Sequence, residues 1–348
     1  MLDRLKMTNF MLFDEAEIAW SPGINVVVGE NGTGKSQLLK LGYSVAWTSA
    51  AMGRSSRQTK EEFQKRLADK LVATARPESL GRLVSRKQGR NRCDIEVSFD
   101  RPPGSDFSFS FATNARSEVK LEKMPAAYAA ILPVFVPTRE MLSFFPGFAS
   151  SYEERHLEFD ETYYDLAKAL DATLLRKHSN AVSRMIGDLE SVLGGKIRQD
   201  AGRFYLYPDK TGVGKLEIPL VAEGMRKLAL LAYLLMNGTL RVGSTLFWDE
   251  PESNLNPRLI ALLARVLSEL AAHGLQVVVA THSLFLLREI ALLQRDAKRS
   301  VRYVGLSLDG ESVKVEQSDS LEGIGTLVLL DEELNQSDRY LAAEGPDA

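Results

Sequence analysis

Residues 24–36 read INVVVGENGTGKS, and this stretch decides the fold. Its first part, from Ile24 to Val28, is a short apolar run followed by glycine, which is typical of a buried central strand. The second part, GENGTGKS, fits the pattern G-x-x-x-x-G-K-[S/T], and the following QLLKLGYSVAW has the apolar content of a helix. A strand, a glycine-rich loop and a helix in direct succession predict a phosphate-binding loop. A chance glycine turn would leave the flanking strand and helix unexplained.

Each part of this loop has a chemical reason. Glycines permit a tight turn whose backbone N–H groups point at phosphate oxygens, and the helix presents its positive end to the same anion. We expect Lys35 to reach the β- and γ-phosphates, with a catalytic role, and Ser36 to be a Mg²⁺ ligand. The sequence therefore predicts ATP and Mg²⁺ as cofactors. The predicted nucleotide-binding residues of the loop are Gly29, Asn31, Gly32, Thr33, Gly34, Lys35, Ser36 and Gln37.

A second stretch, STLFWDEPESNLNP at residues 244–257, places two acids after an apolar strand. Ligands of doubly wound folds bind at the carboxyl ends of strands, so Asp249 is predicted to hold Mg²⁺ together with Ser36. Glu250 is predicted to orient and polarise the attacking water, because hydrolysis of a phosphoanhydride depends on positioning and charge stabilisation. The alternative is that Asp-Glu-Pro only leads into a helix that begins near Pro257.

A third signal is His282, in VVVATHS, just beyond another apolar strand. Its ring is predicted to contact the γ-phosphate and the attacking water, as a third catalytic side chain. A hydrogen-bonded histidine at a strand end would be the better interpretation if this residue stood alone. Its position after the Asp-Glu pair, again at a strand end, favours the catalytic interpretation.

Composition narrows the class of protein. The 348 residues carry a net charge of -3, which gives no global reason to expect nucleic acid or an anionic membrane as partner. The single cysteine, Cys93, excludes an internal disulfide and fits a reducing compartment. The N-terminal stretch has acidic residues and does not read as a signal peptide, and no run approaches the roughly 18 apolar residues of a membrane span. We therefore expect a cytoplasmic protein without membrane association.

The order of elements predicts an α/β fold with a mixed or parallel sheet, because strands and helices alternate after residue 240. The middle of the chain differs. Residues 93–123 indicate a hairpin, residues 155–195 a helical segment with Leu166, Leu170 and Leu174 on one face, and GRFYLYPDK and KLEIPL a pair of strands.

A basic stretch runs from Arg54 to Arg92, with twelve Lys/Arg against four Asp/Glu. Phe63, Leu67 and Leu71 recur every four residues, so part of it is predicted to be an amphipathic helix. The stretch is a candidate for phosphate contacts with DNA. A solvated helix face followed by the loop SRKQGRNR is the simpler alternative.

GENGTGKS, FWDEPESNLNP and ATHS occur in this order after an early Asn9-Phe10, and the chain thus resembles AAA-type, ABC-type P-loop ATPase heads of the RecF/SMC and OLD-like groups. The resemblance covers residues 1–50 and 220–305. It implies a P-loop NTPase head formed by residues 1–50 and 216–316. Residues 51–215 would then be an α+β insertion, with the basic helix, the hairpin and a helical lid, and residues 317–348 an acidic tail.

The same resemblance implies further site residues. Asn254, in the segment Ser253 to Asn256, has the position of the D-loop, and Thr138-Arg139-Glu140 that of a Q-loop without its glutamine. Residues 221–227 have the position of the signature Leu-Ser-X-Gly-Gln, with alanine at the serine position. Gly224 is implied to approach a phosphate, with Arg226 or Lys227 supplying positive charge.

In function, the resemblance implies a homodimer, or another even number of heads, that sandwiches ATP and acts as a nucleotide-gated switch. Its setting would be DNA maintenance or prokaryotic anti-phage or toxin–antitoxin-like defence. Only a hairpin and an acidic tail follow residue 305, so we expect a nuclease or other effector to act in trans. One alternative is the nucleotide-binding subunit of a membrane transporter, which should keep the full signature and the glutamine. Another is a nearly inactive ATP-bound scaffold or antitoxin, which a phosphate-release assay would separate from an active enzyme.

Overall fold

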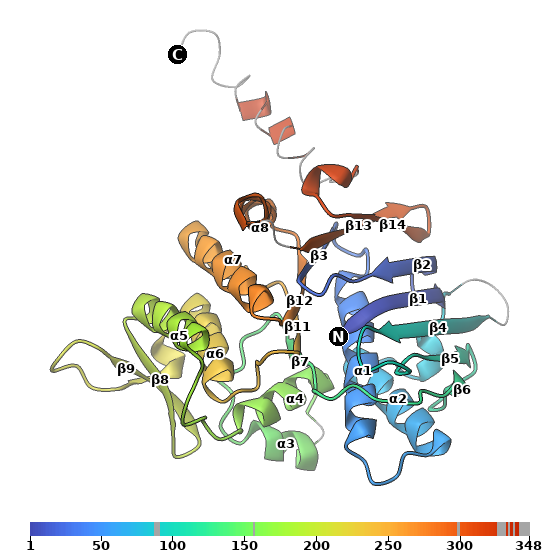
Figure 1. The fold of residues 1–348 in the computed structure, drawn as a ribbon, viewed down its shortest axis with the longest axis horizontal. Coiled ribbons are helices and arrows are strands. Elements are labelled where there is room, and N and C mark those ends of the chain that lie inside the picture. The colour runs from blue at the N-terminus through green and yellow to red at the C-terminus, as the bar shows by residue number, and fades with distance from the viewer. Residues whose placement is uncertain are drawn as a thin grey trace.

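The computed structural model describes residues 1–86, 91–155, 157–297 and 300–325, together with 332, 335, 336 and 338–340. A central sheet divides the molecule into two sides (Figure 1). One side carries an antiparallel sheet and two helices from the first third of the chain, and the other carries the later helices. Among the described residues, no helix is both long enough and apolar enough to cross a bilayer.

The central sheet has six strands in the order β14-β13-β3-β12-β11-β7. β3 lies between β12 and β13 and is parallel to both, with Val26 opposite Val279 on one side and Tyr303 on the other. Only β14 runs antiparallel to its neighbour, so the sheet is mixed and the predicted α/β class is confirmed. The strands are β3 (Ile24–Gly29), β7 (Val134–Val136), β11 (Thr245–Asp249), β12 (Gln276–Thr281), β13 (Val301–Asp309) and β14 (Ser312–Ser318).

Alternate residues of these strands face two separate cores, as the period of a strand requires. Val26 and Val28 belong to the core beneath the later helices, whereas Val27 belongs to the core beneath α1 and the antiparallel sheet. All three are fully buried, which explains why β3 reads as a continuous apolar run. The helices on the two sides are α1 (Lys35–Gly53), α2 (Lys60–Ala75), α3 (Phe148–Arg155), α4 (Glu161–Leu170), α5 (Asn180–Leu193), α6 (Glu223–Met236), α7 (Pro257–Ala272) and α8 (Leu284–Ala297).

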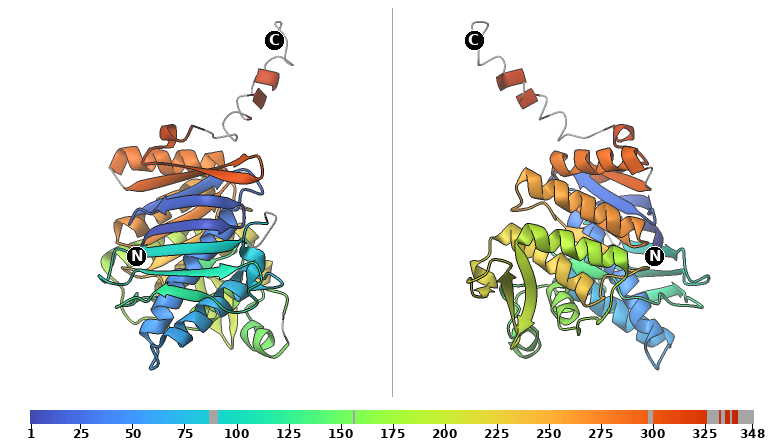
Figure 2. Two further views of the ribbon diagram at one scale, coloured as in Figure 1. Left: turned by 90° about the vertical axis from the view of Figure 1, so that its right-hand side faces the viewer. Right: turned by 60° about the vertical axis from the view of Figure 1, so that its left-hand side comes forward.

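The antiparallel sheet has the order β2-β1-β4-β5-β6 and lies beside the central sheet (Figure 2, left). The buried side chain of Gln276, in β12, joins the two sheets: its amide accepts from the Leu2 N–H and donates to the Leu2 and Ser21 carbonyls. The strands of the antiparallel sheet are β1 (Leu2–Phe10), β2 (Phe13–Ala19), β4 (Arg92–Phe99), β5 (Phe107–Ala112) and β6 (Lys120–Lys123).

This sheet changes the predicted division of the chain. The boundary at residue 50 was placed where the composition becomes basic, but β4 pairs with β1 over six residue pairs, and α2 packs on α1. β7 is an edge strand of the central sheet itself. Much of residues 51–215 is therefore built into the two sheets of the head. Backbone pairing over such sequence distances leaves no signature in local composition.

The rest of the middle segment forms helices and a small sheet of order β10-β9-β8: β8 (Gly195–Asp200), β9 (Arg203–Pro208) and β10 (Leu216–Glu217). The predicted pairing of GRFYLYPDK with KLEIPL covers only two residue pairs, and β8 is the main partner of β9. α4 ends at Leu170, so the prediction that Leu174 continues its apolar face is wrong, and this side chain is 42% exposed. Short 3₁₀ turns complete the fold: η1 (Leu80–Leu83), η2 (Ile218–Leu220) and η3 (Leu321–Gly323).

The basic stretch from Arg54 to Arg92 begins just after α1, includes α2 and η1 and ends at the start of β4, and residues 87–90 lie outside the described residues. Lys70, on α2, is only 2% exposed and pairs with Glu161 and Asp165 of α4. It stabilises the fold and is not available to a phosphate backbone. Of the predicted acidic tail, residues 317–325 are described and begin with the end of β14, whereas most of the remainder lies outside the described residues.

Candidate nucleotide and metal site

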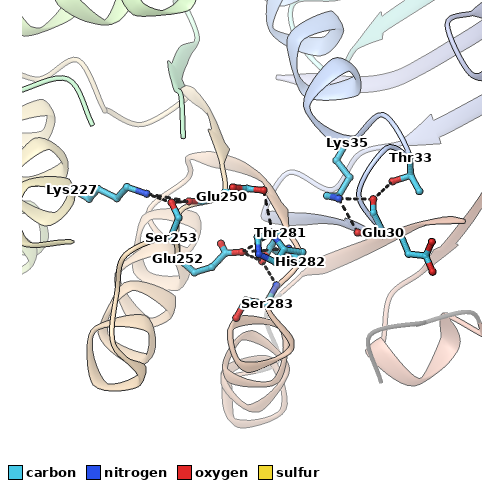
Figure 3. A network of polar contacts seen from close by, with 11 residues as sticks. Glu30, Thr33, Lys35, Lys227, Glu250, Glu252, Ser253, Thr281, His282 and Ser283 are labelled. Atoms are coloured by element: carbon cyan, nitrogen blue, oxygen red, sulfur yellow. Dashed lines mark hydrogen bonds and ion pairs between the residues drawn. The ribbon is translucent and has the colours of Figure 1, made fainter. Parts of the chain in front are cut away.

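The phosphate-binding loop closes around its own lysine. Lys35 Nζ donates to the Gly29 and Glu30 carbonyls, both at 2.8 Å, and Thr33 Oγ1 donates to Glu30 O at 2.9 Å (Figure 3). Gly34 has a φ of 85°, in the left-handed region that favours glycine, and a side chain there would also meet the ring of Phe13 at 3.2 Å. The loop thus takes its shape from its own backbone and from packing against β2.

The loop leads directly into α1, whose first residue is Lys35. No acidic residue lies in the first turn of this helix, so the helix itself places no anion at its positive end. Burial lowers the pKa of Lys35, and the nearby carboxylates of Glu250 and Asp249 oppose that effect. These acids therefore lie within electrostatic range of the loop lysine, although β11 and the loop are more than 200 residues apart.

Asp249 ends β11 and is only 8% exposed. Burial raises the pKa of its carboxyl, and a hydrogen bond from the hydroxyl of Ser36 partly offsets the rise. Oδ1 of this carboxylate is buried without a hydrogen-bond partner among the described residues, which costs free energy unless a cation or water is bound. The predicted metal residues Ser36 and Asp249 therefore lie together.

These two oxygen donors fit Mg²⁺. This ion commonly takes one or two protein oxygens and completes its octahedron with water and phosphate oxygens. The described part of the chain holds no cluster of three or more His, Cys, Asp and Glu side chains that could form a metal cage. A site of this kind would bind the metal as a complex with a nucleotide.

Glu250 follows Asp249 and has an unusual backbone conformation, with a φ of 49°. This conformation turns the side chain away from the strand direction, and its Oε1 lies 3.2 Å from Nδ1 of His282. Both side chains are partly exposed at the carboxyl ends of β11 and β12 (Figure 3). The predicted pair of water-positioning residues is thus in direct contact.

Sequence reasoning missed a buried acid that supports this pair. Glu252 Oε1 accepts a hydrogen bond from Thr281 Oγ1 at 2.5 Å and another from the backbone N–H of His282 at 3.3 Å. Burial raises the pKa of Glu252, and these hydrogen bonds oppose the rise. The carboxylate fixes the main chain that carries His282. The signal is the third acid of the DEPE sequence at residues 249–252, which the sequence analysis does not single out.

The segment predicted as the signature lies against the segment predicted as the D-loop in the same chain. A side chain at Gly224 would come within 2.6 Å of Asn254 O, so this close approach requires glycine. Asn254 itself has a left-handed backbone, with a φ of 64°. The two predicted residues therefore contact each other.

Arg226 and Lys227, which the sequence analysis expects next to a phosphate, contact other groups of the same chain. Arg226 Nε lies 3.1 Å from Oε1 of Glu140, the buried acid of the segment predicted as a Q-loop, and Lys227 is directed at the residues after β11. The Arg139 N–H of the same segment hydrogen bonds to the hydroxyl of Tyr163, and burial raises the pKa of that hydroxyl to about 12. The expectation that Arg226 or Lys227 is free to meet a phosphate is wrong for this conformation.

Three other predicted residues of the loop differ in their surroundings. Asn31 and Gly32 are exposed, and no atom lies within 4 Å of the position where a side chain of Gly32 would begin. Gln37 lies in the first turn of α1, and its side-chain oxygen is buried without a hydrogen-bond partner among the described residues.

Two family comparisons cover different parts of the chain. Residues 4–123 match a family described as "AAA domain", and residues 144–288 match one described as "AAA domain, putative AbiEii toxin, Type IV TA system". The first match includes the phosphate-binding loop, and the second includes Asp249, Glu250 and His282.

Curated relatives match over a shorter length. The DNA replication and repair protein RecF of Enterobacter sp. (strain 638) is 36% identical over 99 residues, which is 27% of this chain and 27% of that protein. RecF of Salmonella typhimurium gives the same figures. The chain thus aligns with about a quarter of the length of these relatives.

Solved structures share the fold over nearly the whole chain. An SMC head domain with an extended coiled coil, bound to the C-terminal domain of ScpA and derived from Pyrococcus furiosus, has a TM-score of 0.56 at 13% identity, covering 97% of this chain and 99% of that one. An SMC head bound to the C-winged helix domain of ScpA has a TM-score of 0.53 at 16% identity, covering 92% and 98%. The two matched family models, the RecF relatives and this shared fold together support an ABC-type, RecF/SMC-like ATPase head for this chain.

Proposed function

We propose that this protein binds ATP with Mg²⁺ and hydrolyses it to ADP and phosphate. The observation that carries the proposal is the pairing of Ser36 with Asp249, which brings a hydroxyl and a buried, partly unpartnered carboxylate from distant segments to one point. A divalent cation bound there would compensate the buried charge and bridge to the phosphates held by the loop.

The roles of the other residues follow from their positions. Lys35 leaves the Gly29 and Glu30 carbonyls and neutralises the β- and γ-phosphates when a nucleotide enters the loop. Glu250 holds the attacking water in line with the γ-phosphate, and His282 keeps the Glu250 carboxylate in place while contacting the phosphate.

The proposal extends to a dimer of heads that closes on ATP. The first turn of α6 begins after Ala222, which offers no side-chain hydrogen bond to the free N–H groups of the helix. A second copy could direct this helix end at the nucleotide of the first, with Asn254 at the seam. Ala222 has no hydroxyl and Arg226 is paired with Glu140, so backbone N–H groups of the helix end would make the contact with the phosphate.

For the cellular role, we propose a nucleotide-gated switch in DNA maintenance or in anti-phage defence, with an effector in trans. The RecF relatives support the first setting, and the match to the AbiEii family supports the second. DNA contact through the exposed part of the segment between Arg54 and Arg92 belongs to the same proposal. A transporter subunit is disfavoured by the altered signature and the absent Q-loop glutamine.

The test compares wild type, Lys35→Ala and Glu250→Gln by nucleotide affinity, steady-state phosphate release and light-scattering mass. Wild type should release phosphate with Mg²⁺. Lys35→Ala should lose ATP binding by at least about 100-fold, because a desolvated cation on the phosphates is removed. Glu250→Gln should keep ATP affinity, lose turnover by about 100-fold or more, and accumulate as an ATP-bound dimer.

Equal phosphate release by wild type and Glu250→Gln would refute the assignment of Glu250. Binding without turnover in wild type would instead favour an ATP-bound scaffold. A wild-type protein that binds no ATP at millimolar concentration with Mg²⁺ would refute the proposal as a whole.

A further inference from the structure

Lys227 is a buried cation that the proposed chemistry leaves unexplained. It lies in the second turn of α6, and only 1% of its surface is exposed. Its Nζ donates to the backbone carbonyl of Glu250 at 3.2 Å and to the hydroxyl of Ser253 (Figure 3). An ammonium group is almost never buried unless its donors are satisfied, so these contacts set its place in the fold.

The carbonyl that Lys227 holds belongs to a strained residue. Glu250 has a φ of 49°, in the left-handed region that is unfavourable for a residue with a side chain. Its N–H donates to Ala280 O at 2.9 Å, and its carbonyl also accepts from the N–H and the hydroxyl of Ser253, at 3.2 and 2.9 Å. The residue is therefore fixed from the β12 side through its N–H and from the α6 side through its carbonyl.

The surrounding charges favour an ammonium ion at this position. The carboxylates of Glu252, Glu223 and Glu250 raise the pKa of Lys227, in that order, although burial has the larger and opposite effect. Glu252 is itself tied to the chain segment of His282. The ammonium group of Lys227 thus lies near carboxylates that also hold the Glu250–His282 pair in place.

We propose that Lys227 is a positioning residue for hydrolysis: from α6 it fixes the main chain of Glu250, so that the Glu250 carboxylate stays directed at His282 and at the γ-phosphate side of the site. The proposal rests on the proposed function and deepens it. Lys227 touches neither the nucleotide nor the water; it acts through the direction of one peptide group.

A mechanical consequence follows from the attachment to α6. The first turn of this helix also carries Gly224 against Asn254 and Arg226 against Glu140. Any displacement of the helix end would therefore move the carbonyl of Glu250 through Lys227. The orientation of the water-positioning carboxylate is in this way linked to the position of α6.

The experiment uses the full chain with Lys227→Met, Lys227→Gln and Lys227→Arg. Lys215→Met is the matched control, because Lys215 also pairs with an acid but is 39% exposed. Lys227→Met should lower kcat for ATP at least about tenfold while the Kd for ATP changes less than about threefold, since the phosphate-binding loop is untouched. Gln and Arg keep donors and should recover part of kcat. Lys215→Met should match wild type.

A double variant separates positioning from a general loss of structure. If Lys227 acts through Glu250, then Lys227→Met should add less than about twofold to the loss caused by Glu250→Gln, whereas independent effects would multiply. If Lys227→Met fails to fold, the same comparison is made with Lys227→Gln. An unchanged kcat in a folded Lys227 variant, or multiplicative losses, would overturn the inference while leaving the proposed hydrolysis intact. A wild type without ATPase activity would overturn both.

Discussion

Replacing Gly224 by alanine should disturb the contact between α6 and the D-loop. The added carbon would lie 2.6 Å from Asn254 O and 2.8 Å from Leu255 Cδ2. Ordinary contact begins at 3.4 Å, so the backbone of Asn254 would have to move by roughly 0.8 Å. Forcing an extra carbon into a packed region costs about 1–3 kcal/mol, against a helix-propensity gain of about 1 kcal/mol for alanine.

Gly187 provides the matched control. It lies in α5, and no atom is found within 4 Å of the position that its added carbon would take. Gly187→Ala should therefore receive only the helix-propensity gain and stabilise the protein by about 0.5–1 kcal/mol. We expect the free energies of unfolding of the two variants to differ by about 2 kcal/mol, with Gly224→Ala the less stable.

The assay is urea unfolding followed by circular dichroism, with phosphate release measured on the same samples. Gly224→Ala should also lower kcat, because the shifted D-loop begins at the residues that hold the Glu250 carbonyl. If Gly224→Ala were as stable as Gly187→Ala, the close approach of α6 to Asn254 would be refuted.

Two further variants test buried charge. Asp249→Asn should raise the stability of the Mg²⁺-free protein at pH 7 by on the order of 1 kcal/mol, because burial raises the pKa of this carboxyl and its ionised form is therefore costly above that pKa. The same variant should abolish stabilisation by Mg²⁺-ATP. Thermal unfolding with and without Mg²⁺-ATP measures both effects, and a less stable Mg²⁺-free variant would contradict the reasoning. Lys70→Met should cost about 3–5 kcal/mol at pH 7, since Glu161 and Asp165 lose their buried cation. Burial already raises the pKa of Glu161 and Lys70 lowers it, so the pKa of Glu161 should rise further in the variant. The lost stability should therefore return as the pH falls from 7 toward the ordinary glutamate value of 4.5. A loss of stability that does not depend on pH would count against this ion pair.

The core of the site could be predicted because its residues are locally encoded. GENGTGKS, the acids at the end of β11 and the histidine after β12 each follow a short apolar run, and parallel strands bring such ends to one edge. The mixed α/β class follows from the same runs and is confirmed. The individual catalytic roles remain predictions until nucleotide and turnover are measured.

The parts that could not be predicted depend on contacts between distant segments. Lys227 has the sequence context of any basic residue on an amphipathic helix, and only the fold places it beneath Glu250. The pairing of β4 with β1 is likewise invisible locally, so residues after 50 were separated from the head. Arg226 was assigned to a phosphate because its partner Glu140 lies 86 positions earlier in the chain.

The position of β3 has a consequence for biosynthesis. Both of its neighbours, β12 and β13, are translated roughly 250 residues after it, so for most of synthesis its three valines have no sheet to join. Until the ribosome has delivered β13, the nascent chain carries an exposed, aggregation-prone strand that either remains collapsed on α1 or requires a chaperone. The strand that leads into the phosphate-binding loop can therefore join its sheet only after β12 has been made.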